Sequence, residues 1–330
     1  MYDKYYGKHW VRKEGWLPSG KAFAAKYRKK YLKYLTLCAE NAIDIFLFEK
    51  EGLLHRNKNS ELQDVIICEK DVSAAQRIFA LVRPPLKEAV FIGKLESILN
   101  FEEDHHTRGI DPDDDTINQR NSQIRQKFKY KKDHLRLLHE FPFDLINFDI
   151  VENMLRNTET PLLRSLQKIF EFQQDTNFLL FVTIPIEDIN ASFYALFKER
   201  MQENIDSHIE IKQAFEERFD IDADFDSIDQ KCKITIGFAK QIIIPYADQY
   251  NWQCRHHGTF IYENNRGRRM LNTIVELSKN QAENHYVRDV VNIIKNMPHF
   301  MPYQENYPTE IVEDLEAIIE YRERIRNENT

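Results

Sequence analysis

Residues 43–54 read IDIFLFEKEGLL, and this stretch decides how the rest of the chain is interpreted. The apolar run at 42–48 predicts a short buried strand, and the charged residues after it predict a turn. In nucleotide-binding α/β folds the first strand runs into a glycine-rich turn. Here Phe48 and Lys50 stand where such glycines are expected, so the stretch predicts the strand without its glycine turn.

The chain continues as an alternation of apolar runs and helical patterns. Continuously apolar runs such as VIIC at 65–68 are typical of a parallel sheet that helices cover on both faces. We therefore predict an α/β fold with a doubly wound, mostly parallel sheet and a terminal antiparallel hairpin. The further expected strands are 65–68, 89–93, 143–150, 177–186, 241–246 and 258–263. The expected helices are 74–82, 161–172, 188–219, 267–279, 283–297 and 309–326.

Helix signals support two of these boundaries. Asp71 or Ser73 is a candidate cap for the helix at 74–82, and Pro84 with the next proline would end it. Thr160 followed by Pro161 is a favourable helix start, with a capping residue and then a proline at the first helical position.

The sequence divides into three parts. Residues 1–42 are a basic, aromatic segment, expected to be irregular at first and then helical from about 21 to 38. Residues 43–268 form the α/β domain, with an insertion at 100–136, and residues 269–330 are expected to be helical. The last helix is amphipathic, which makes oligomerisation through the C-terminal helices an open alternative to packing on the domain.

Composition limits the class of protein. The chain has 330 residues, of which 42% are hydrophobic and 9 are glycine, which is enough for one large α/β domain with additions. It has no apolar run near the ~20 residues of a membrane helix, and we expect no membrane association. Four widely spaced cysteines and an N-terminus without a hydrophobic segment predict a reduced, cytoplasmic protein with thiols used in the core.

Charge is distributed unevenly. Residues 1–35 hold ten Lys and Arg against two Asp and Glu, a net charge of +8 within a chain of net charge −7. Cations can meet phosphates while interleaved rings stack on unpaired bases. The alternative is a solvated helix face with its aromatic residues packed onto the sheet. The candidate nucleic-acid contacts are Lys8, Trp10, Arg12, Lys26, Lys29 and Lys30.

In its predicted strand order with a late hairpin, the chain resembles the class I S-adenosylmethionine-dependent methyltransferase fold. It is most similar to the three-Cys-motif partner family over about residues 20–275. The likeness rests on IDIFLFEK at 43–50, VIICEKD at 65–71, LINFDI at 145–150, and GFAKQIIIPY followed by GTFIYENNRGRRML.

The resemblance implies roles for four residues. Asp44 and Phe46 match the family's cofactor motif, Glu69 would accept hydrogen bonds from the cofactor ribose, and Asp149 would face the group that receives the methyl. Each carboxylate also has an alternative. Asp44 could be a structural cap, Glu69 an ordinary charged residue at a strand end, and Asp149 a loop carboxylate that survives from an active ancestor.

The departures from the family pattern concern the same site. Phe48 and Lys50 replace glycines that would let the backbone pass beneath the cofactor. Ile150 and Glu152 replace the usual Pro and Gly after Asp149, and no Asn-Pro-Pro-Tyr or Asp-Pro-Pro-Tyr is present. The cofactor is therefore expected to be S-adenosylmethionine or none.

Two histidine-containing segments raise the question of a metal. His105 and His106 lie in an acidic stretch, and adjacent residues point in different directions on a helix or a strand. Cys254, His256 and His257 lack a second ligand pair at zinc-finger spacing. We expect a solvated loop at the first segment and no metal at either.

Three functional hypotheses remain. The first is a methyltransferase-fold protein with an eroded cofactor loop that acts as a non-catalytic binding or regulatory component, with nucleic acid or a protein encoded alongside as candidate partners. The second is an active S-adenosylmethionine-dependent methyltransferase acting on nucleic acid, with Asp149 as the acceptor-holding group. The third is a structural or assembly protein that forms a stable oligomer and binds no ligand.

Overall fold

The computed structural model describes most of the chain. The described residues are 6–38, 41–84, 89–102, 104–109, 111, 122–149, 161–186, 191–219, 243–264, 267–279, 285–296, 299–300 and 308–328.

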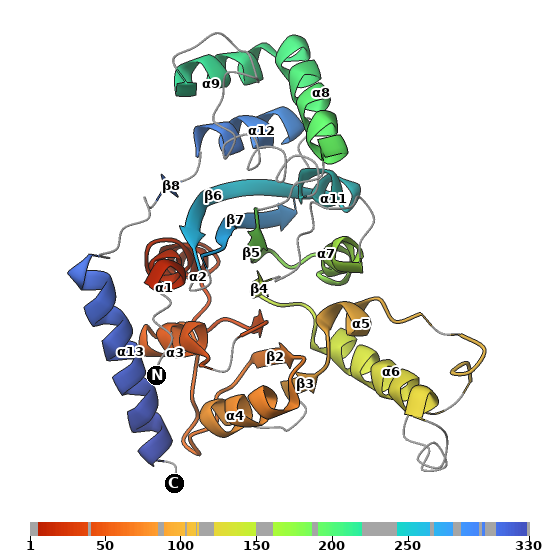
Figure 1. Ribbon diagram of the computed structural model, residues 1–330, viewed down its shortest axis with the longest axis vertical. Coiled ribbons are helices and arrows are strands. Elements are labelled where there is room, and N and C mark those ends of the chain that lie inside the picture. The colour runs from red at the N-terminus through yellow and green to blue at the C-terminus, as the bar shows by residue number, and fades with distance from the viewer. Residues whose placement is uncertain are drawn as a thin grey trace.

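These residues form a mixed α/β structure around one sheet of order β3-β2-β1-β4-β5-β7-β6-β8 (Figure 1). The pairs from β3 through β5 are parallel, and β7 is antiparallel to both β5 and β6. The prediction of an α/β fold with a mostly parallel sheet and an antiparallel end is confirmed. The strands are β1 (Tyr34–Thr36), β2 (Val65–Glu69), β3 (Val90–Ile92), β4 (Leu145–Asp149), β5 (Phe178–Pro185), β6 (Trp252–Glu263), β7 (Arg269–Lys279) and β8 (His299–Phe300).

Helices cover both faces of the sheet, because successive strand residues point to opposite sides. Leu145 and Ile146 of β4, for example, enter two different hydrophobic cores. The core that contains Leu145 is covered by α1 (Tyr6–Val11), a π-helical segment η1 (Arg12–Trp16), α2 (Leu17–Lys26), α3 (Ile43–Lys50), α4 (Val72–Val82) and α13 (Thr309–Glu328). The core that contains Ile146 is covered by α5 (Leu95–Leu99), α6 (Ser122–Glu140), α7 (Pro161–Phe172), α8 (Ala191–Ser207), α9 (Ile209–Phe219), α11 (Ile244–Gln249) and α12 (His285–Lys295).

Several predicted elements are confirmed. The strands expected at 65–68, 89–93, 143–150 and 177–186 are β2, β3, β4 and β5, and the helix expected at 309–326 is α13. Asp71 is the cap of α4, where its side chain accepts a hydrogen bond from the Ala74 backbone N–H. Thr160, the expected cap of α7, lies outside the described residues.

The prediction for residues 42–48 is wrong, because this run belongs to helix α3. The first strand is β1, which lies inside the helix expected at 21–38. Residues 43–49 are all buried, since α3 is packed between the sheet and α13. A helix buried on every side has a continuous apolar sequence, which periodicity cannot distinguish from a buried strand.

Two predictions near the C-terminal hairpin are also wrong. The strand expected at 241–246 is replaced, over its described part, by the start of helix α11. The helix expected at 267–279 is the strand β7, which is paired along its length with β5 and with β6. Hydrogen bonds to two neighbouring strands override the local helical pattern of this segment. The hairpin therefore consists of β6 and β7, and it includes the strand expected at 258–263.

The N-terminal segment is helical from Tyr6 to Lys26, and not irregular as expected. Pro18 lies at the start of α2, directly after the π-helical segment η1. Gly15 lets the segment approach the hairpin closely, because a Cβ there would lie 2.6 Å from the Phe260 ring and 2.7 Å from Ile274. The segment is thus part of the domain's core.

The sheet extends beyond residues 43–268, which are the limits expected for the α/β domain. β1 lies before this range and β7 after it, and both are central strands of the sheet. Within the expected insertion at 100–136, helix α6 extends away from the body of the molecule, at the lower right of Figure 1. No helix among the described residues is long and apolar enough to cross a membrane.

Candidate functional site

The candidate site lies at the carboxyl ends of the parallel strands. β1 has β2 on one side and β4 on the other, so the chain order reverses between β1 and β4. In open α/β sheets, ligands bind in the crevice outside the carboxyl ends of the strands at such a reversal. Thr36, Glu69 and Asp149 are the last residues of β1, β2 and β4.

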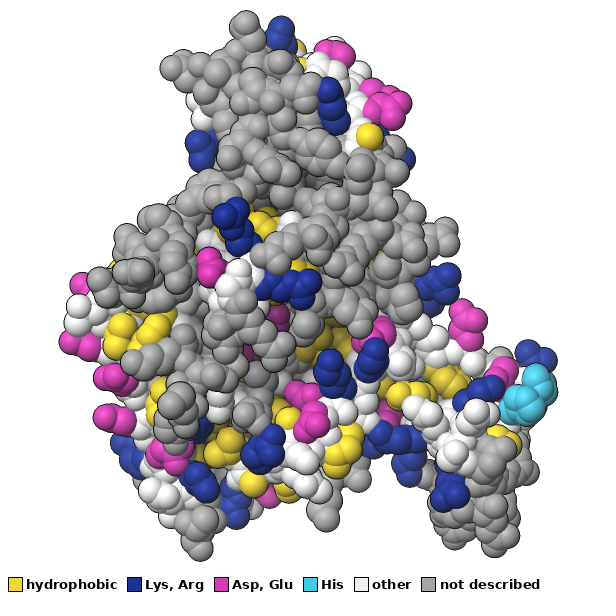
Figure 2. Space-filling model, in the orientation of Figure 1, with side chains coloured by type: hydrophobic (Ala, Val, Ile, Leu, Met, Phe, Trp, Pro, Cys, Tyr) yellow, Lys and Arg dark blue, Asp and Glu magenta, His cyan; other side chains and the backbone are white. Residues whose placement is uncertain are grey.

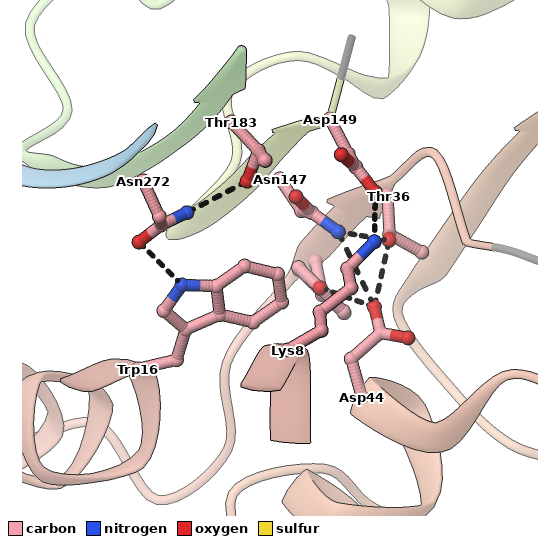
Figure 3. Close-up of polar contacts among 9 residues, drawn as sticks. Lys8, Trp16, Thr36, Asp44, Asn147, Asp149, Thr183 and Asn272 are labelled. Carbon is pink, nitrogen blue, oxygen red and sulfur yellow. Dashed lines mark hydrogen bonds and ion pairs between the residues drawn. The ribbon is translucent and has the colours of Figure 1, made fainter. Parts of the chain in front are cut away.

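Asp44 is the centre of a buried polar network at this point (Figure 3). Its Oδ2 atom accepts hydrogen bonds from the Tyr34 hydroxyl at 2.6 Å and the Thr36 hydroxyl at 2.9 Å. The Asn147 amide donates to Thr36 Oγ1 at 3.1 Å and reaches Asp44 Oδ2 at 3.5 Å. The network ties the start of α3 to strands β1 and β4, and within the described residues Asp44 does not act as the helix cap that the sequence offered as its alternative role.

Two acceptor atoms of this network have no partner among the described residues. Asp44 Oδ1 and Asn147 Oδ1 are buried and make no hydrogen bond within that part of the chain. Buried polar atoms are nearly always satisfied, so each such atom calls for an explanation. Both would suit a ligand or a water molecule that brings hydrogen-bond donors.

The turn between β1 and α3 comes earlier in the chain than the turn predicted after residues 42–48. The turn follows Thr36 and precedes Ile43, with residues 39–40 outside the described part of the chain. Phe48, which stands at one of the expected glycine positions, lies in α3, where it packs edge-on against Tyr34 at 5.4 Å between ring centroids and tilted against Phe181 at 6.3 Å. Lys50 is exposed at the end of α3.

Phe46 and Glu69 complete the predicted cofactor set. Phe46 is fully buried and contacts Tyr321 of α13 at 6.5 Å between ring centroids, so its ring belongs to the core. Glu69 is half-buried, and its Oε1 atom accepts a hydrogen bond from the Asp71 backbone N–H at 2.9 Å. Of the predicted cofactor-binding residues, Glu69 is the one whose carboxylate remains partly exposed at the strand end.

Asp149 is paired with the N-terminal helix. Lys8, in α1, donates to Asp149 Oδ2, and each side chain is 16% exposed (Figure 3). The predicted acceptor-holding carboxylate and one of the predicted nucleic-acid contacts are therefore partners in one ion pair. The structure brings them together although no motif in the sequence links them.

A second polar chain lies beside this ion pair. The Trp16 indole N–H donates to Asn272 Oδ1 at 3.0 Å, and the Asn272 amide donates to Thr183 Oγ1 at 2.7 Å (Figure 3). The Trp16 ring stacks on Phe181 with centroids 4.9 Å apart and planes 4° apart. These contacts fix η1 on the strands β5 and β7, which holds Lys8 over the end of β4.

Most of the other predicted nucleic-acid contacts also have partners within the protein. Lys26 pairs with Glu276 and Lys29 with Asp144, each at 2.5 Å. Lys30 is exposed. Among the side chains coloured in Figure 2, Lys and Arg are interspersed with Asp and Glu.

Trp10 and Arg12, the remaining two, face the protein. Trp10 packs edge-on against Phe260, with ring centroids 5.1 Å apart. Arg12 is 5% exposed, and its guanidinium lies 5.8 Å from the centroid of the Trp16 ring. Arg12 is thus turned away from solvent, whereas Trp10 is half-buried.

The segments considered for metal binding are arranged for other contacts. His256 contacts Thr259 at 2.7 Å and Thr273 at 3.0 Å, and burial lowers its pKa to about 3. His257 instead contacts Glu276 at 2.9 Å. In the described part of the chain, no three His, Cys, Asp or Glu side chains are grouped so as to hold a metal ion.

The described cysteines are core residues. Cys38, Cys68 and Cys254 are free and buried, and burial raises the pKa of each thiol. A neutral, buried thiol is a poor nucleophile. Their use as small core residues agrees with the prediction, and Cys232 lies outside the described residues.

Sequence reasoning missed Thr36, Asn147, Thr183 and Asn272. Each is a buried polar residue within an apolar strand, and each lies in or beside the site. For Asn147 and Thr183, a polar side chain in a strand that is otherwise apolar was the available signal, since burying it requires a hydrogen-bond partner. Asn272 lies in a segment that was expected to be a helix, so this signal was absent for it.

Comparison of the chain with family models, with curated proteins and with solved structures finds no match. The class of protein is therefore defined by the structure alone: a mixed α/β protein with a polar, partly unsatisfied network at the carboxyl edge of its sheet.

Proposed function

We propose that the chain is a methyltransferase-fold protein that works without methyl transfer, as a binding or regulatory component. The order β3-β2-β1-β4-β5-β7-β6, with helices on both faces and a late antiparallel hairpin, supports the fold part of this proposal. It agrees with what the resemblance to class I S-adenosylmethionine-dependent methyltransferases implies.

The ion pair between Lys8 and Asp149 carries the functional part of the proposal. An enzyme that uses Asp149 to hold the methyl acceptor needs that carboxylate open to the acceptor. Here Lys8 takes one of its oxygens, and both side chains are mostly buried. Because η1 is fixed by the Trp16 hydrogen bond and stacking, the backbone that carries Lys8 is held close to Asp149.

A second candidate function is methyl transfer itself, and two observations favour it. Glu69 keeps a partly exposed carboxylate at the end of β2, where the family would hold the ribose. Asp44 Oδ1 and Asn147 Oδ1 are acceptors without a partner in the described part of the chain, and a cofactor's amino group could donate to them.

Calorimetric titration separates the two candidates. The full chain is titrated with S-adenosylmethionine and with S-adenosylhomocysteine, alongside Glu69→Ala and a control at an exposed position, Glu171→Ala. Our proposal expects no binding at millimolar ligand. Micromolar binding that Glu69→Ala abolishes and Glu171→Ala retains would overturn the proposal in favour of methyl transfer.

The partner is tested in the same series. If neither nucleoside binds, single-stranded RNA and DNA are the next titrants, with Lys30→Glu as the variant at an exposed predicted contact that has no ion pair among the described residues. Binding that weakens in Lys30→Glu and falls with salt supports nucleic acid as the partner. Its absence favours a protein partner.

A further inference from the structure

Arg12 is a buried arginine without a counterion among the described residues. The residue is 5% exposed, and its Nε atom is buried without a hydrogen-bond partner. Within the described part of the chain, Arg12 forms no ion pair, and its one side-chain partner is the Trp16 ring. Burying an unpaired charge is costly, so such a group calls for a partner.

Two other arginines with little exposure show what such a partner normally is. Arg56, with a side chain 10% exposed, binds the Glu49 carboxylate through Nε at 2.6 Å and through Nη2 at 2.8 Å. Arg322, 3% exposed, donates to Glu323 at 2.7 Å. Each has a carboxylate, which is the planar acceptor that suits a guanidinium. Arg12 has none among the described residues.

The surroundings of Arg12 are those of the candidate site. Lys8 precedes it by four residues on a helical segment, so the two cations lie on the same side of it. Tyr262, near the end of β6, is buried at 5% exposure. Burial raises the pKa of Tyr262, the charge of Asp149 raises it further, and the charge of Arg12 lowers it, which places both charges near this phenol.

We propose that Arg12 and Lys8 form a binding site for an oxyanion group, a carboxylate or a phosphate, of a ligand that enters at the carboxyl edge of the sheet. The guanidinium would bind the oxyanion through its open hydrogen-bond donors. Lys8, now paired with Asp149, would share its charge between Asp149 and the ligand. The inference does not rest on the methyltransferase likeness, because it needs no cofactor at Glu69.

The test measures thermal unfolding of the full chain at pH 7 in inorganic phosphate and, separately, in acetate, with sodium chloride at equal ionic strength as reference. A ligand that binds the folded state raises Tm in a saturable way. We expect such a rise in the wild type with one of the two probes, and its loss in Arg12→Met. The matched control is Arg322→Met, which removes a buried arginine that has a carboxylate partner and should keep the rise.

Stability without added oxyanion gives a second readout. Arg12→Met should unfold at the same temperature as the wild type or higher, because it removes an unpaired buried charge, whereas Arg322→Met should unfold at a lower temperature. Direct calorimetric titration of the wild type with each probe covers the case in which Arg12→Met fails to fold. A wild type that shows no saturable response to either probe beyond chloride, or an Arg12→Met variant with an unchanged response, overturns the proposal.

Discussion

Lys8 and Asp149 are 141 positions apart in the sequence and form an ion pair over the carboxyl end of β4. One lies in the first helix and the other ends a central parallel strand. The pair closes the N-terminal segment over the edge of the sheet where ligands bind in this architecture. Whatever binds at this edge has to accommodate the pair or separate it.

The pair should contribute measurably to stability. Because both side chains are 16% exposed, we expect a coupling of about 1–2 kcal/mol in a double-mutant cycle of Lys8→Met and Asp149→Asn. Urea unfolding at pH 7 measures it. The exposed pair of Lys168 and Glu171 is the reference, and its coupling should stay below about 0.5 kcal/mol. Equal couplings for the two pairs would show that the Lys8 pair does not fix α1.

Gly15 should be intolerant of any side chain. A Cβ there would lie 2.6 Å from Phe260 and 2.7 Å from Ile274, so Gly15→Ala has to push η1 off the hairpin. We expect a loss of about 1–3 kcal/mol and a weaker near-ultraviolet circular dichroism signal, because Trp16 would leave its stack on Phe181.

Gly52 provides the control for that substitution. It has a φ of +76° and nothing within 4 Å of an added Cβ, so Gly52→Ala should cost about 1 kcal/mol through backbone strain alone. Its aromatic signal should be unchanged. If Gly15→Ala keeps the wild-type aromatic signal, the close approach of η1 to the hairpin does not determine the position of Trp16.

Sequence patterns predicted the fold class and four of the parallel strands, because those strands are apolar runs of strand length bounded by turns. They failed at α3 and β7, where tertiary contacts decide the local structure. The sequence of the buried helix α3, which packs under α13, has the continuous apolar pattern of a strand. The sequence of β7, which pairs with a strand on each side, has the pattern of a helix. The first error moved the expected cofactor turn from the end of β1 to Phe48 and Lys50.

The candidate site was predictable in part for a similar reason. Glu69 and Asp149 follow apolar runs directly, so their positions at strand ends can be read from the sequence. The partner of Asp149 is Lys8, which belongs to the basic, aromatic N-terminal segment and was expected to contact nucleic acid or solvent. Charge composition indicates how many cations a segment has, but the fold decides which carboxylates they meet. For Lys8, Lys26 and Lys29, those carboxylates belong to the protein itself.

Glu276 should be a source of acid sensitivity. Burial would raise its pKa, but hydrogen bonds from His257, Lys26 and Tyr27 lower it to about 2. A lowered carboxyl pKa stabilises the fold above the unfolded value of 4.5, and this stabilisation is lost as pH falls from 4.5 through 2. Glu276→Gln should therefore cost about 3 kcal/mol at pH 7, and less as the pH is lowered.

Urea unfolding of the wild type and of Glu276→Gln at pH 7 and at pH 3 measures this change. The exposed Glu171→Gln variant serves as control, and its effect should be small at both values. A loss for Glu276→Gln that is the same at pH 7 and pH 3 would mean that its hydrogen bonds do not depend on the carboxylate charge.

Asp289 should make the fold less stable as the pH rises, which is the opposite of the effect of Glu276. It lies in α12 at 1% exposure, where its Oδ2 atom accepts a hydrogen bond from the Cys254 backbone N–H at 2.8 Å. Burial raises its pKa to about 6, against the lowering effects of that hydrogen bond and of His285 and Arg288. Because the folded state holds the proton more tightly than the unfolded state, this group lowers stability as pH rises from about 4 to about 6.

Asp289→Asn removes the titration and keeps an oxygen that can accept from Cys254. We expect the variant to be about 2–3 kcal/mol more stable than the wild type at pH 7.5, and close to it at pH 4. Urea unfolding at the two pH values measures the difference, with His285→Gln as a check on the neighbouring charge. A variant that is less stable than the wild type at pH 7.5 would show that the ionised carboxylate is needed to join α12 to β6, because the neutral amide would then fail to replace its hydrogen bond.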